Sequence, residues 1–373
     1  MTVTLDHLRR FAVARSLFKP TTLKRALDRL GFVQSDPIRA PARAQDLILR
    51  HRVKDYSVGD LERLYPRLGI EEDFFVVYGF LTRPMQRLMH PRANAGVPAE
   101  GSRPWSAAQK NQARVLLKFV RKCGEAHPRD VDRHFSHGSV RNYWGGVSNA
   151  TTHLLAAMHY RGLLRVTRRE RGVRIYAEQH HAIEPAGAAE RRARLDALVD
   201  VAVQIYAPLP GPCLSDLVRR LRFAVPQWRS ELKNALQRAK QRLSQRRVEG
   251  VDWYWPVEED IDAVEPPTTV RLLTPFDPVV WDRERFELLW GWAYRFEAYT
   301  PAPKRKLGYY AMPLLWRENV IGWANVSVEN GRLKPEFGYI GSRRPFDRRF
   351  KHELEAELAR IRCFLSVGSK HLT

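Results

Sequence analysis

Two polar side chains, Gln34 and Asp36, stand two residues apart in the stretch GFVQSDPI at residues 31–38. If this stretch is extended, alternate side chains share one face, so both polar groups point the same way. A carboxylate in such a place can take a proton from water, and an amide can hold that water. We therefore treat Gln34 and Asp36 as candidate catalytic residues.

Asp36 also has a simpler interpretation as a helix cap. It precedes Pro37, and Asp followed by Pro is typical of the N-cap and first position of a helix. Residues 40–52 have a helical composition, so a helix could follow. The spacing alone leaves both roles open.

The composition indicates a globular protein with a polyanionic partner. The chain has 373 residues, 44% of them hydrophobic, which is enough for roughly two or three domains with real cores. Its formal net charge of +22 favours nucleic acid over a membrane as the partner. No run approaches the roughly 18 apolar residues of a membrane-spanning helix, so we expect no membrane association.

Cysteine and histidine usage predicts neither a disulfide framework nor a metal site. Cys123, Cys213 and Cys363 are far apart and form no CxxC pair, and the histidines lack ligand spacing. We therefore expect reduced thiols, no metal and no cofactor. No signal peptide is recognisable at the start, so the expected location is a bacterial cytoplasm, at the nucleoid through DNA binding.

Residues 1–95 are predicted to form a first winged-helix domain that carries the Gln-x-Asp motif. Apolar spacing indicates helices over residues 5–14 and 23–30, the second capped by Thr21 or Thr22 and ended by Gly31. Residues 91–104 are rich in Pro, Gly and Ala and are expected to form a linker.

Residues 105–183 and 188–257 each repeat an order of three helices and a basic hairpin, which is the order of a winged helix. The third helix of such a domain usually enters a groove of DNA. The predicted helices span residues 106–123, 128–135 and 149–162 in the first segment, and 189–206, 215–221 and 228–243 in the second.

Residues 270–373 are predicted to form a small C-terminal β-barrel with a closing helix. The expected strands and the final helix span residues 309–315, 320–328, 333–339 and 347–364. The predicted fold class is therefore α+β, with three tandem winged-helix domains followed by the barrel.

Basic residues concentrate at hairpin turns, on helices and in a Pro-rich loop of the expected barrel. Such residues usually contact phosphate groups, and a stiff loop with an aromatic residue is suited to press on a groove. The candidate DNA contacts are Arg39, Arg43, Arg168, Arg169, Arg171, Lys233, Tyr299, Lys304, Arg305 and Lys306.

The segments TPFDPVVWDR at 274–283, YRFEAYTP at 294–301 and GYY at 308–310 resemble the AlkZ/YcaQ-type DNA glycosylases, and the resemblance covers nearly the whole chain. It implies a C-shaped array of three winged helices with a barrel, and removal of alkylated purines without a metal. Some members also unhook interstrand crosslinks. The family motif is Gln, an aliphatic residue, then Gln or Asp, and Ser35 departs from it here.

The implied chemistry needs only one carboxylate. An N7-alkylguanine is positively charged and already a good leaving group, so no general acid is required. Asp36 would stabilise the oxocarbenium ion or activate water, and Gln34 would hold the water or the sugar-phosphate. No lysine lies in the motif, so we expect a monofunctional glycosylase acting as a monomer on alkylated or crosslinked double-stranded DNA.

The main alternative is a non-catalytic tandem winged-helix DNA-binding protein or transcription regulator. A carboxylate facing the phosphate groups would repel DNA in such a protein, and regulators usually bind palindromes as symmetric dimers. A nuclease fits less well because the sequence has no acidic metal cluster.

Overall fold

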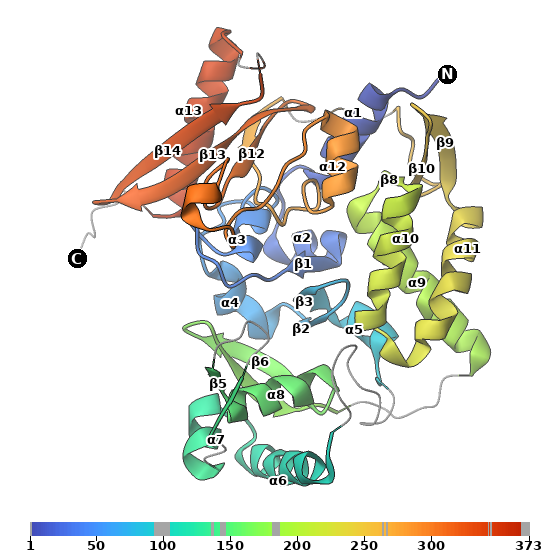
Figure 1. Ribbon diagram of the computed structural model, residues 1–373, viewed down its shortest axis with the longest axis vertical. Coiled ribbons are helices and arrows are strands. Elements are labelled where there is room, and N and C mark those ends of the chain that lie inside the picture. Colours follow the sequence, from blue (N-terminus) through green and yellow to red (C-terminus); the bar gives the residue numbers. More distant parts are fainter. Residues whose placement is uncertain are drawn as a thin grey trace. The chain divides into compact units, whose positions relative to one another are not determined.

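The computed structural model of the protein describes residues 2–92, 105–135, 138–141, 147–180, 187–262, 265, 268–341, 343 and 345–366. Helices alternate with small sheets in these ranges, which confirms the expected mixture of α and β elements (Figure 1). The residues group into two compact units. Unit 1 comprises residues 1–61, 200–216 and 237–373, and unit 2 comprises residues 62–199 and 217–236.

Unit 1 begins with two helices whose ends follow from the sequence. α1 (Leu5–Ser16) precedes α2 (Leu23–Leu30). α2 starts at the cap residue Thr22 and ends at Gly31, whose φ of 70° favours glycine. β1 (Phe32–Gln34) follows immediately.

The helix expected over residues 40–52 is much shorter than predicted. α3 covers only Ala44–Leu49. Pro41 offers no N–H and disfavours the helical conformation at the residue before it, so the helix begins only after this point. α4 (Asp60–Leu64) is a second short helix.

The C-terminal part of unit 1 contains an antiparallel sheet with the strand order β11-β12-β13-β14. The predicted barrel is not closed among the residues that the structure describes, because β14 pairs with β13 and not with β11. The strands are β11 (Val270–Leu272), β12 (Met312–Trp316), β13 (Asn319–Glu329) and β14 (Arg332–Tyr339), and the helices of this part are α12 (Arg283–Trp290) and α13 (Arg348–Phe364).

Two features keep this sheet open. The segment between β11 and β12 forms α12 and irregular loops, so only four strands are available, too few for a barrel. The free edge of β11 also binds side chains of α13. The Leu272 N–H donates to Glu357, and Arg360 donates to the Val270 carbonyl, at 3.0 Å each. A covered edge has no groups left for pairing with another strand.

A buried ion pair joins three segments of unit 1. The Arg52 guanidinium donates to both carboxylate oxygens of Asp277, at 2.8 and 2.9 Å, and both side chains are fully buried. Arg52 also donates to the carbonyls of Ser16 and Ile48, at 2.9 and 2.8 Å. The pair thus ties the end of α1, the end of α3 and the turn after β11 together.

Unit 2 contains the order of three helices and a hairpin that was expected for residues 105–183. The first helix begins after its cap residue Ser106, as predicted. The hairpin turns at Arg171 and Gly172, whose φ values of 49° and 86° suit a tight two-residue turn. The elements are α6 (Ala107–Cys123), α7 (Pro128–Phe135), β4 (Ser139–Arg141), β5 (Val147–Asn149), α8 (Ala150–Tyr160), β6 (Leu164–Glu170) and β7 (Val173–Glu178).

Residues 188–257 repeat helices and a hairpin, and each of the three helices runs across a boundary between the units. Ser215 does not begin the second helix as predicted. That helix begins at Gly211, and the Ser215 hydroxyl donates to the Gly211 carbonyl at 2.8 Å, a bond typical of a helix interior. The elements are α9 (Ala188–Tyr206), β8 (Leu209–Pro210), α10 (Gly211–Arg220), α11 (Leu232–Arg242), β9 (Ser244–Val248) and β10 (Val251–Trp255).

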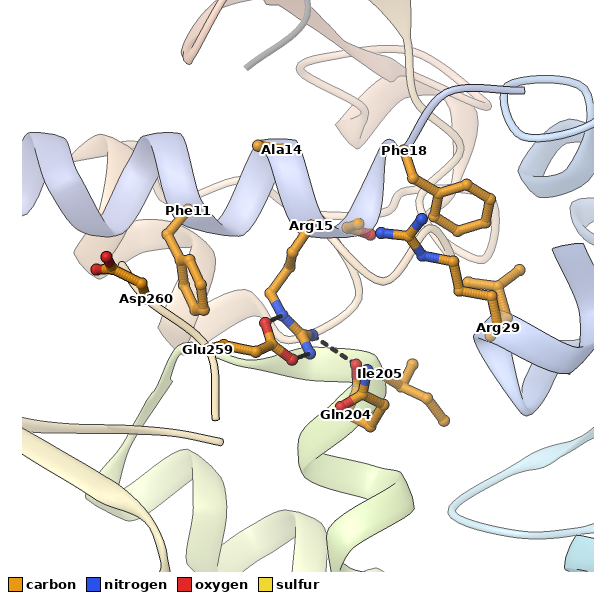
Figure 2. A pocket seen from close by; sticks show the side chains of 11 residues that line it. Phe11, Ala14, Arg15, Phe18, Arg29, Gln204, Ile205, Glu259 and Asp260 are labelled. Carbon is orange, nitrogen blue, oxygen red and sulfur yellow. Dashed lines mark hydrogen bonds and ion pairs between the residues drawn. The ribbon is translucent and has the colours of Figure 1, made fainter. Parts of the chain in front are cut away.

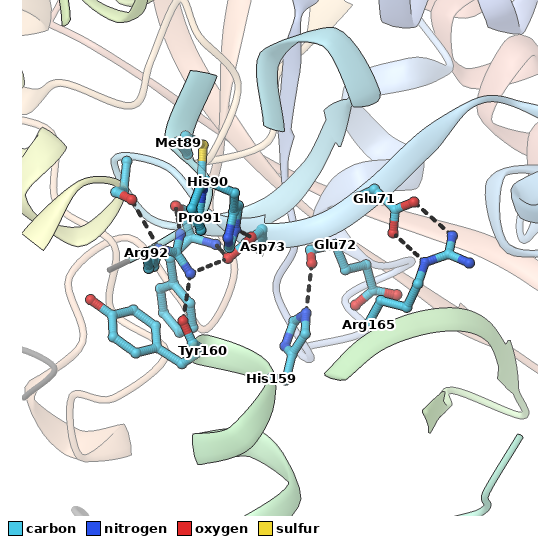
Figure 3. A network of polar contacts seen from close by, with 12 residues as sticks. Glu71, Glu72, Asp73, Met89, His90, Pro91, Arg92, His159, Tyr160 and Arg165 are labelled. Carbon is cyan, nitrogen blue, oxygen red and sulfur yellow. Dashed lines mark hydrogen bonds and ion pairs between the residues drawn. The ribbon is translucent and has the colours of Figure 1, made fainter. Parts of the chain in front are cut away.

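Unit 2 also contains a hairpin of β2 (Ile70–Phe74) and β3 (Tyr78–Thr82). β2 carries three consecutive buried carboxylates, and β3 leads into α5 (Arg83–Met89). Each carboxylate has a basic partner, as Figure 3 shows for two of them. The pairs are Glu71 with Arg165 at 2.6 Å, Glu72 with Arg169 at 2.7 and 2.6 Å, and Asp73 with His90 and Arg92 at 2.7 Å each.

These contacts and the burial itself shift the pKa values of the buried groups. Burial alone would raise the pKa of Asp73, but Arg92 and His90 outweigh it and hold that pKa well below its ordinary value. The pKa of Glu72 is lowered in the same way, mainly by Arg169. Burial lowers the pKa of His159 to about 4, and its Nε2 lies 2.8 Å from the Glu72 carbonyl oxygen.

We predict that Asp277→Asn destabilises the protein by about 3–5 kcal/mol, because it leaves the Arg52 charge buried without its partner. Urea unfolding followed by tryptophan fluorescence measures the change. Asp28→Asn removes an exposed partner of Lys24, 2.9 Å away on α2, and should have a much smaller effect. Equal effects of the two variants would contradict the assigned importance of the buried pair.

We also predict that unit 2 loses stability in acid in two stages. His159 is kept neutral in the fold, so stability falls as the pH drops from about 6.5 to about 4. Asp73 has a lowered pKa, so its stabilisation is present above its ordinary pKa near 3.8 and is lost below it. His90 is also buried with a lowered pKa, so His159→Gln should reduce but not abolish the first stage in urea midpoints measured against pH. Exposed His153→Gln should leave both stages unchanged. An unchanged profile in His159→Gln would contradict this origin.

Candidate active site

Gln34 lies at the end of β1, behind two buried residues, Phe32 and Val33, that anchor the strand. Its side chain is half-buried. The Oε1 atom is buried and has no hydrogen-bond partner in the part of the chain that the structure describes. A buried carbonyl oxygen without a partner is costly, so this atom is ready to accept a hydrogen bond from a bound water or ligand.

Asp36 is half-buried and lies beyond the end of the strand. Its carboxylate accepts the Ile38 N–H at 2.9 Å, which is an Asx-type turn. Burial raises the pKa of Asp36, against the opposing effect of the Ile38 hydrogen bond. The interpretation of Asp36 as a helix cap is wrong, because the next helix, α3, begins only at Ala44.

The C-terminal part of unit 1 brings two tyrosines close enough to respond to the charge of Asp36. The pKa values of Tyr299 and Tyr310 are both raised, by burial first and then by the Asp36 carboxylate. Tyr310 is buried, and its hydroxyl lies 2.9 Å from the Thr274 hydroxyl. Tyr299 is 65% exposed, so it offers an aromatic surface to solvent in the neighbourhood of Asp36.

An aromatic cluster supports these tyrosines. The ring of Phe296 contacts those of Phe276, Tyr310 and Tyr299, with centroids 5.2, 5.3 and 6.1 Å apart. All three contacts are edge-to-face, the arrangement that aromatic quadrupoles favour. The cluster thereby holds the exposed Tyr299 ring against the half-buried ring of Phe296, which also contacts the buried Tyr310.

Hydrogen bonds between side chains and backbone groups hold the loop between Tyr299 and Tyr310. The Glu297 carboxylate accepts the N–H groups of Lys306 and Leu307 at 2.9 and 2.7 Å. Asn325 on β13 donates to the Leu307 carbonyl at 2.7 Å. Gly308 has a φ of 108°, and a Cβ there would lie 2.3 Å from the Asn325 amide nitrogen, so only glycine fits this approach.

The predicted DNA contacts of unit 1 fall into two groups. Lys304 and Lys306 are exposed, whereas Arg305 is half-buried, donates to the Thr300 carbonyl at 2.8 Å and lies over the Tyr309 ring. Arg39 is exposed, three residues beyond Asp36, and Arg43 is half-buried at the start of α3.

The predicted DNA contacts of unit 2 differ in their exposure and in their ion pairs. Arg171 is exposed at the hairpin turn and Lys233 is exposed on α11. Arg168 pairs with Glu125 at 3.1 Å and also with Glu170.

Arg169 was expected to contact DNA, but this expectation does not fit the geometry. Its side chain is only 8% exposed and donates twice to Glu72. The hairpin turns after Glu170, so Arg169 packs inward rather than at the tip.

A cavity of about 340 Å³ under α1 does not include the candidate residues (Figure 2). Arg15 reaches into it and donates to both oxygens of Glu259, at 2.8 and 2.6 Å. The Arg29 guanidinium lies 4.2 Å from the centre of the Phe18 ring. Because Arg15 is neutralised by Glu259, we interpret this cavity as part of the packing of unit 1.

Thr274 and Tyr310 were not predicted as site residues, although both lie in the segments that carry the family resemblance. Their pairing joins residues far apart in the sequence, so periodicity could not reveal it. In the described ranges no cluster of three His, Cys, Asp or Glu side chains could hold a metal ion. No helix among those ranges is long and apolar enough to cross a bilayer.

The site combines a carboxylate with a raised pKa, an unsatisfied amide oxygen and an exposed ring, and exposed lysines follow that ring in the same loop. These groups suit proton transfer on a polyanionic substrate. The family of AlkZ-like DNA glycosylases matches residues 27–364, and the chain belongs to this family. The fold is similar to that of Streptomyces sahachiroi DNA glycosylase AlkZ, with a TM-score of 0.63 and 16% identity over 98% of each chain.

We predict that Asp36→Asn keeps or slightly raises the melting temperature. A raised pKa means that the ionised carboxylate weakens the fold at neutral pH, and this effect disappears with the neutral amide. The Asn oxygen can still accept the Ile38 N–H. Thermal unfolding at pH 7.5 measures the change, and Asp36→Ala, which loses that bond, is the comparison. A clear fall with Asn would show that the charge itself supports the fold.

Proposed function

We propose that this protein is a monofunctional DNA glycosylase that hydrolyses the N-glycosidic bond of N-alkylated purines of the N7-alkylguanine type. The observation that carries the proposal is the half-buried Asp36 carboxylate, whose pKa is raised, two residues from an amide oxygen without a partner. Membership of a DNA glycosylase family supports the reaction class. We extend the proposed substrates to bulky N7 adducts and interstrand crosslinks.

The proposed reaction follows from the charge of the substrate. An alkyl group on N7 makes the guanine cationic, so the base leaves with the electron pair of the glycosidic bond and becomes neutral. The sugar develops oxocarbenium character, which a nearby carboxylate stabilises. Water then adds to C1′ of the sugar, and Asp36 accepts its proton. No protein group needs to protonate the leaving base.

Gln34 completes this arrangement as a positioning residue. Its buried Oε1 can accept one O–H of the water while Asp36 accepts the other, which orients the oxygen lone pair towards the sugar. Burial that raises the pKa of Asp36 also makes its ionised form a stronger base. The proposed chemistry requires no metal, so a chelator should not reduce the rate.

The DNA-binding surface that we propose combines exposed basic residues with one aromatic ring. Tyr299 stands on the aromatic cluster near Asp36 and would contact a base or sugar beside the lesion. The exposed Arg39, Lys304 and Lys306 would contact phosphate groups. We further propose tandem winged-helix domains, with Arg171 and Lys233 as phosphate contacts, in a protein that acts as a monomer.

We predict that Asp36→Asn lowers excision by about 10²- to 10⁴-fold, because the general base is lost. The substrate is duplex DNA with N7-methylguanine or a nitrogen-mustard crosslink, and alkali converts abasic sites into strand breaks. Excision by the unaltered protein should fall as the pH drops through the pKa of Asp36, which burial raises above the ordinary value of an aspartate. Without alkali, little strand scission is expected.

Two controls make this experiment decisive. Binding of undamaged duplex should be retained in Asp36→Asn, since the variant removes a negative charge from the DNA-binding surface. Gln34→Ala should reduce excision less than Asp36→Asn. Equal excision by the unaltered protein and Asp36→Asn would remove Asp36 from its proposed role. The absence of excision from every alkylated substrate would contradict the proposed activity as a whole.

A further inference from the structure

Unit 2 contains a polar cavity of about 530 Å³ whose lining is rich in arginine. Five elements contribute to it, namely β2, α5, β6, β7 and α9. The basic groups come from Arg83, Arg87, Arg165 and Arg194. The acidic and neutral polar groups of the lining are Glu71, Glu178, Gln86, Gln179, His90 and His180.

One face of α5 supplies three of these groups. Arg83, Gln86 and Arg87 stand at positions i, i+3 and i+4 of the helix, so they are neighbours on its surface. Two like charges at i and i+4 repel each other and weaken a helix. An anion placed between Arg83 and Arg87 would remove this repulsion.

The remaining arginines are held in place by groups that leave part of each guanidinium available. Glu71 accepts hydrogen bonds from both Arg165 and Arg83, at 2.6 and 3.1 Å (Figure 3 shows the Arg165 pair). Arg194 donates to the His90 carbonyl at 2.8 Å and pairs with Glu190. The cluster is therefore built before any ligand arrives, which reduces the entropic cost of binding.

The charge of the lining is not balanced within it. Glu71 is shared between two arginines, and Glu178 is engaged by Arg121, which lies outside the lining. Arg87 is exposed and forms no ion pair among the residues that the structure describes. Four guanidinium groups against two carboxylates leave an excess of two positive charges.

Gln86 adds an observation that does not depend on charge. Its side chain is 8% exposed and lines the cavity from α5. Its amide has no hydrogen-bond partner among the described residues, so it can bond to a ligand in the cavity. An amide N–H beside several guanidinium groups is a suitable donor set for phosphate oxygens.

We propose that this cavity binds a phosphate group of the DNA backbone, held by Arg83 and Arg87 at its mouth and by the Gln86 amide within it. This inference rests on the proposed function only in taking DNA as the partner. Arginine clusters that match the planar geometry of phosphate oxygens are a recurring mode of phosphate recognition. A contact of this kind fixes the register of the protein on DNA without reading sequence.

The test measures binding of the full-length protein to undamaged duplex DNA by fluorescence anisotropy over a series of salt concentrations. Arg87→Gln should bind several-fold more weakly, with the slope of log affinity against log salt reduced by about one. Gln86→Leu should also weaken binding but leave the slope unchanged, because it removes no charge. Arg114→Gln, an exposed arginine of α6 outside the lining, is the matched control and should change little.

A second arm uses inorganic phosphate as the probe. Phosphate should raise the melting temperature of the unaltered protein above that in chloride of equal ionic strength, and Gln86→Leu should reduce this rise. A phosphate effect without any loss of DNA binding in the variants would overturn the assignment to DNA and indicate a free phosphorylated molecule. Equal DNA binding by Arg87→Gln, Gln86→Leu and Arg114→Gln without a phosphate effect would overturn the site itself. Since no damaged base is used, a failure of the excision assay does not affect these results.

Discussion

The buried pair of Arg52 and Asp277 is the interaction on which unit 1 depends. Taking two ions out of water costs several kcal/mol for each, and only a bidentate geometry with further hydrogen bonds offsets this cost. Arg52 meets that condition because both oxygens of Asp277 and two backbone carbonyls accept from it. Asp36 precedes the helix that ends near Arg52, and Thr274 precedes Asp277 by three residues. The pair thus fixes both segments that form the candidate site.

Burial of Asp36 weakens the fold but favours the proposed role of its carboxylate as a base. Burial disfavours the ionised carboxylate and so makes it a better proton acceptor. The aromatic cluster behind Tyr299 and Tyr310 contributes no compensating positive charge. A lysine or arginine paired with Asp36 would stabilise the fold but would also lower the basicity of the carboxylate. Residues held in costly states at a functional site are expected on these grounds.

Local signals predicted the local structure well. The caps at Thr22, Gly31 and Ser106 depend on neighbouring residues, and each is confirmed. The Gln-x-Asp stretch and family membership were also accessible from the sequence. The open sheet could not be predicted from the sequence, because closure depends on whether α13 or another strand binds the edge of β11. The burial of Arg169 could not be predicted for a similar reason, since its partner Glu72 lies far from it in the sequence.

The side chain of Glu357 joins segments of unit 1 that the ribosome makes at very different times. This buried carboxylate of the last helix binds Arg50, near the start of the chain, and the edge of β11. During synthesis the ribosome releases the first segment long before the last one exists. Arg50 and the edge of β11 therefore lack their contacts with Glu357 until α13 has been made. The segment that carries Gln34 and Asp36 therefore gains this stabilising contact only after more than three hundred further residues have been synthesised.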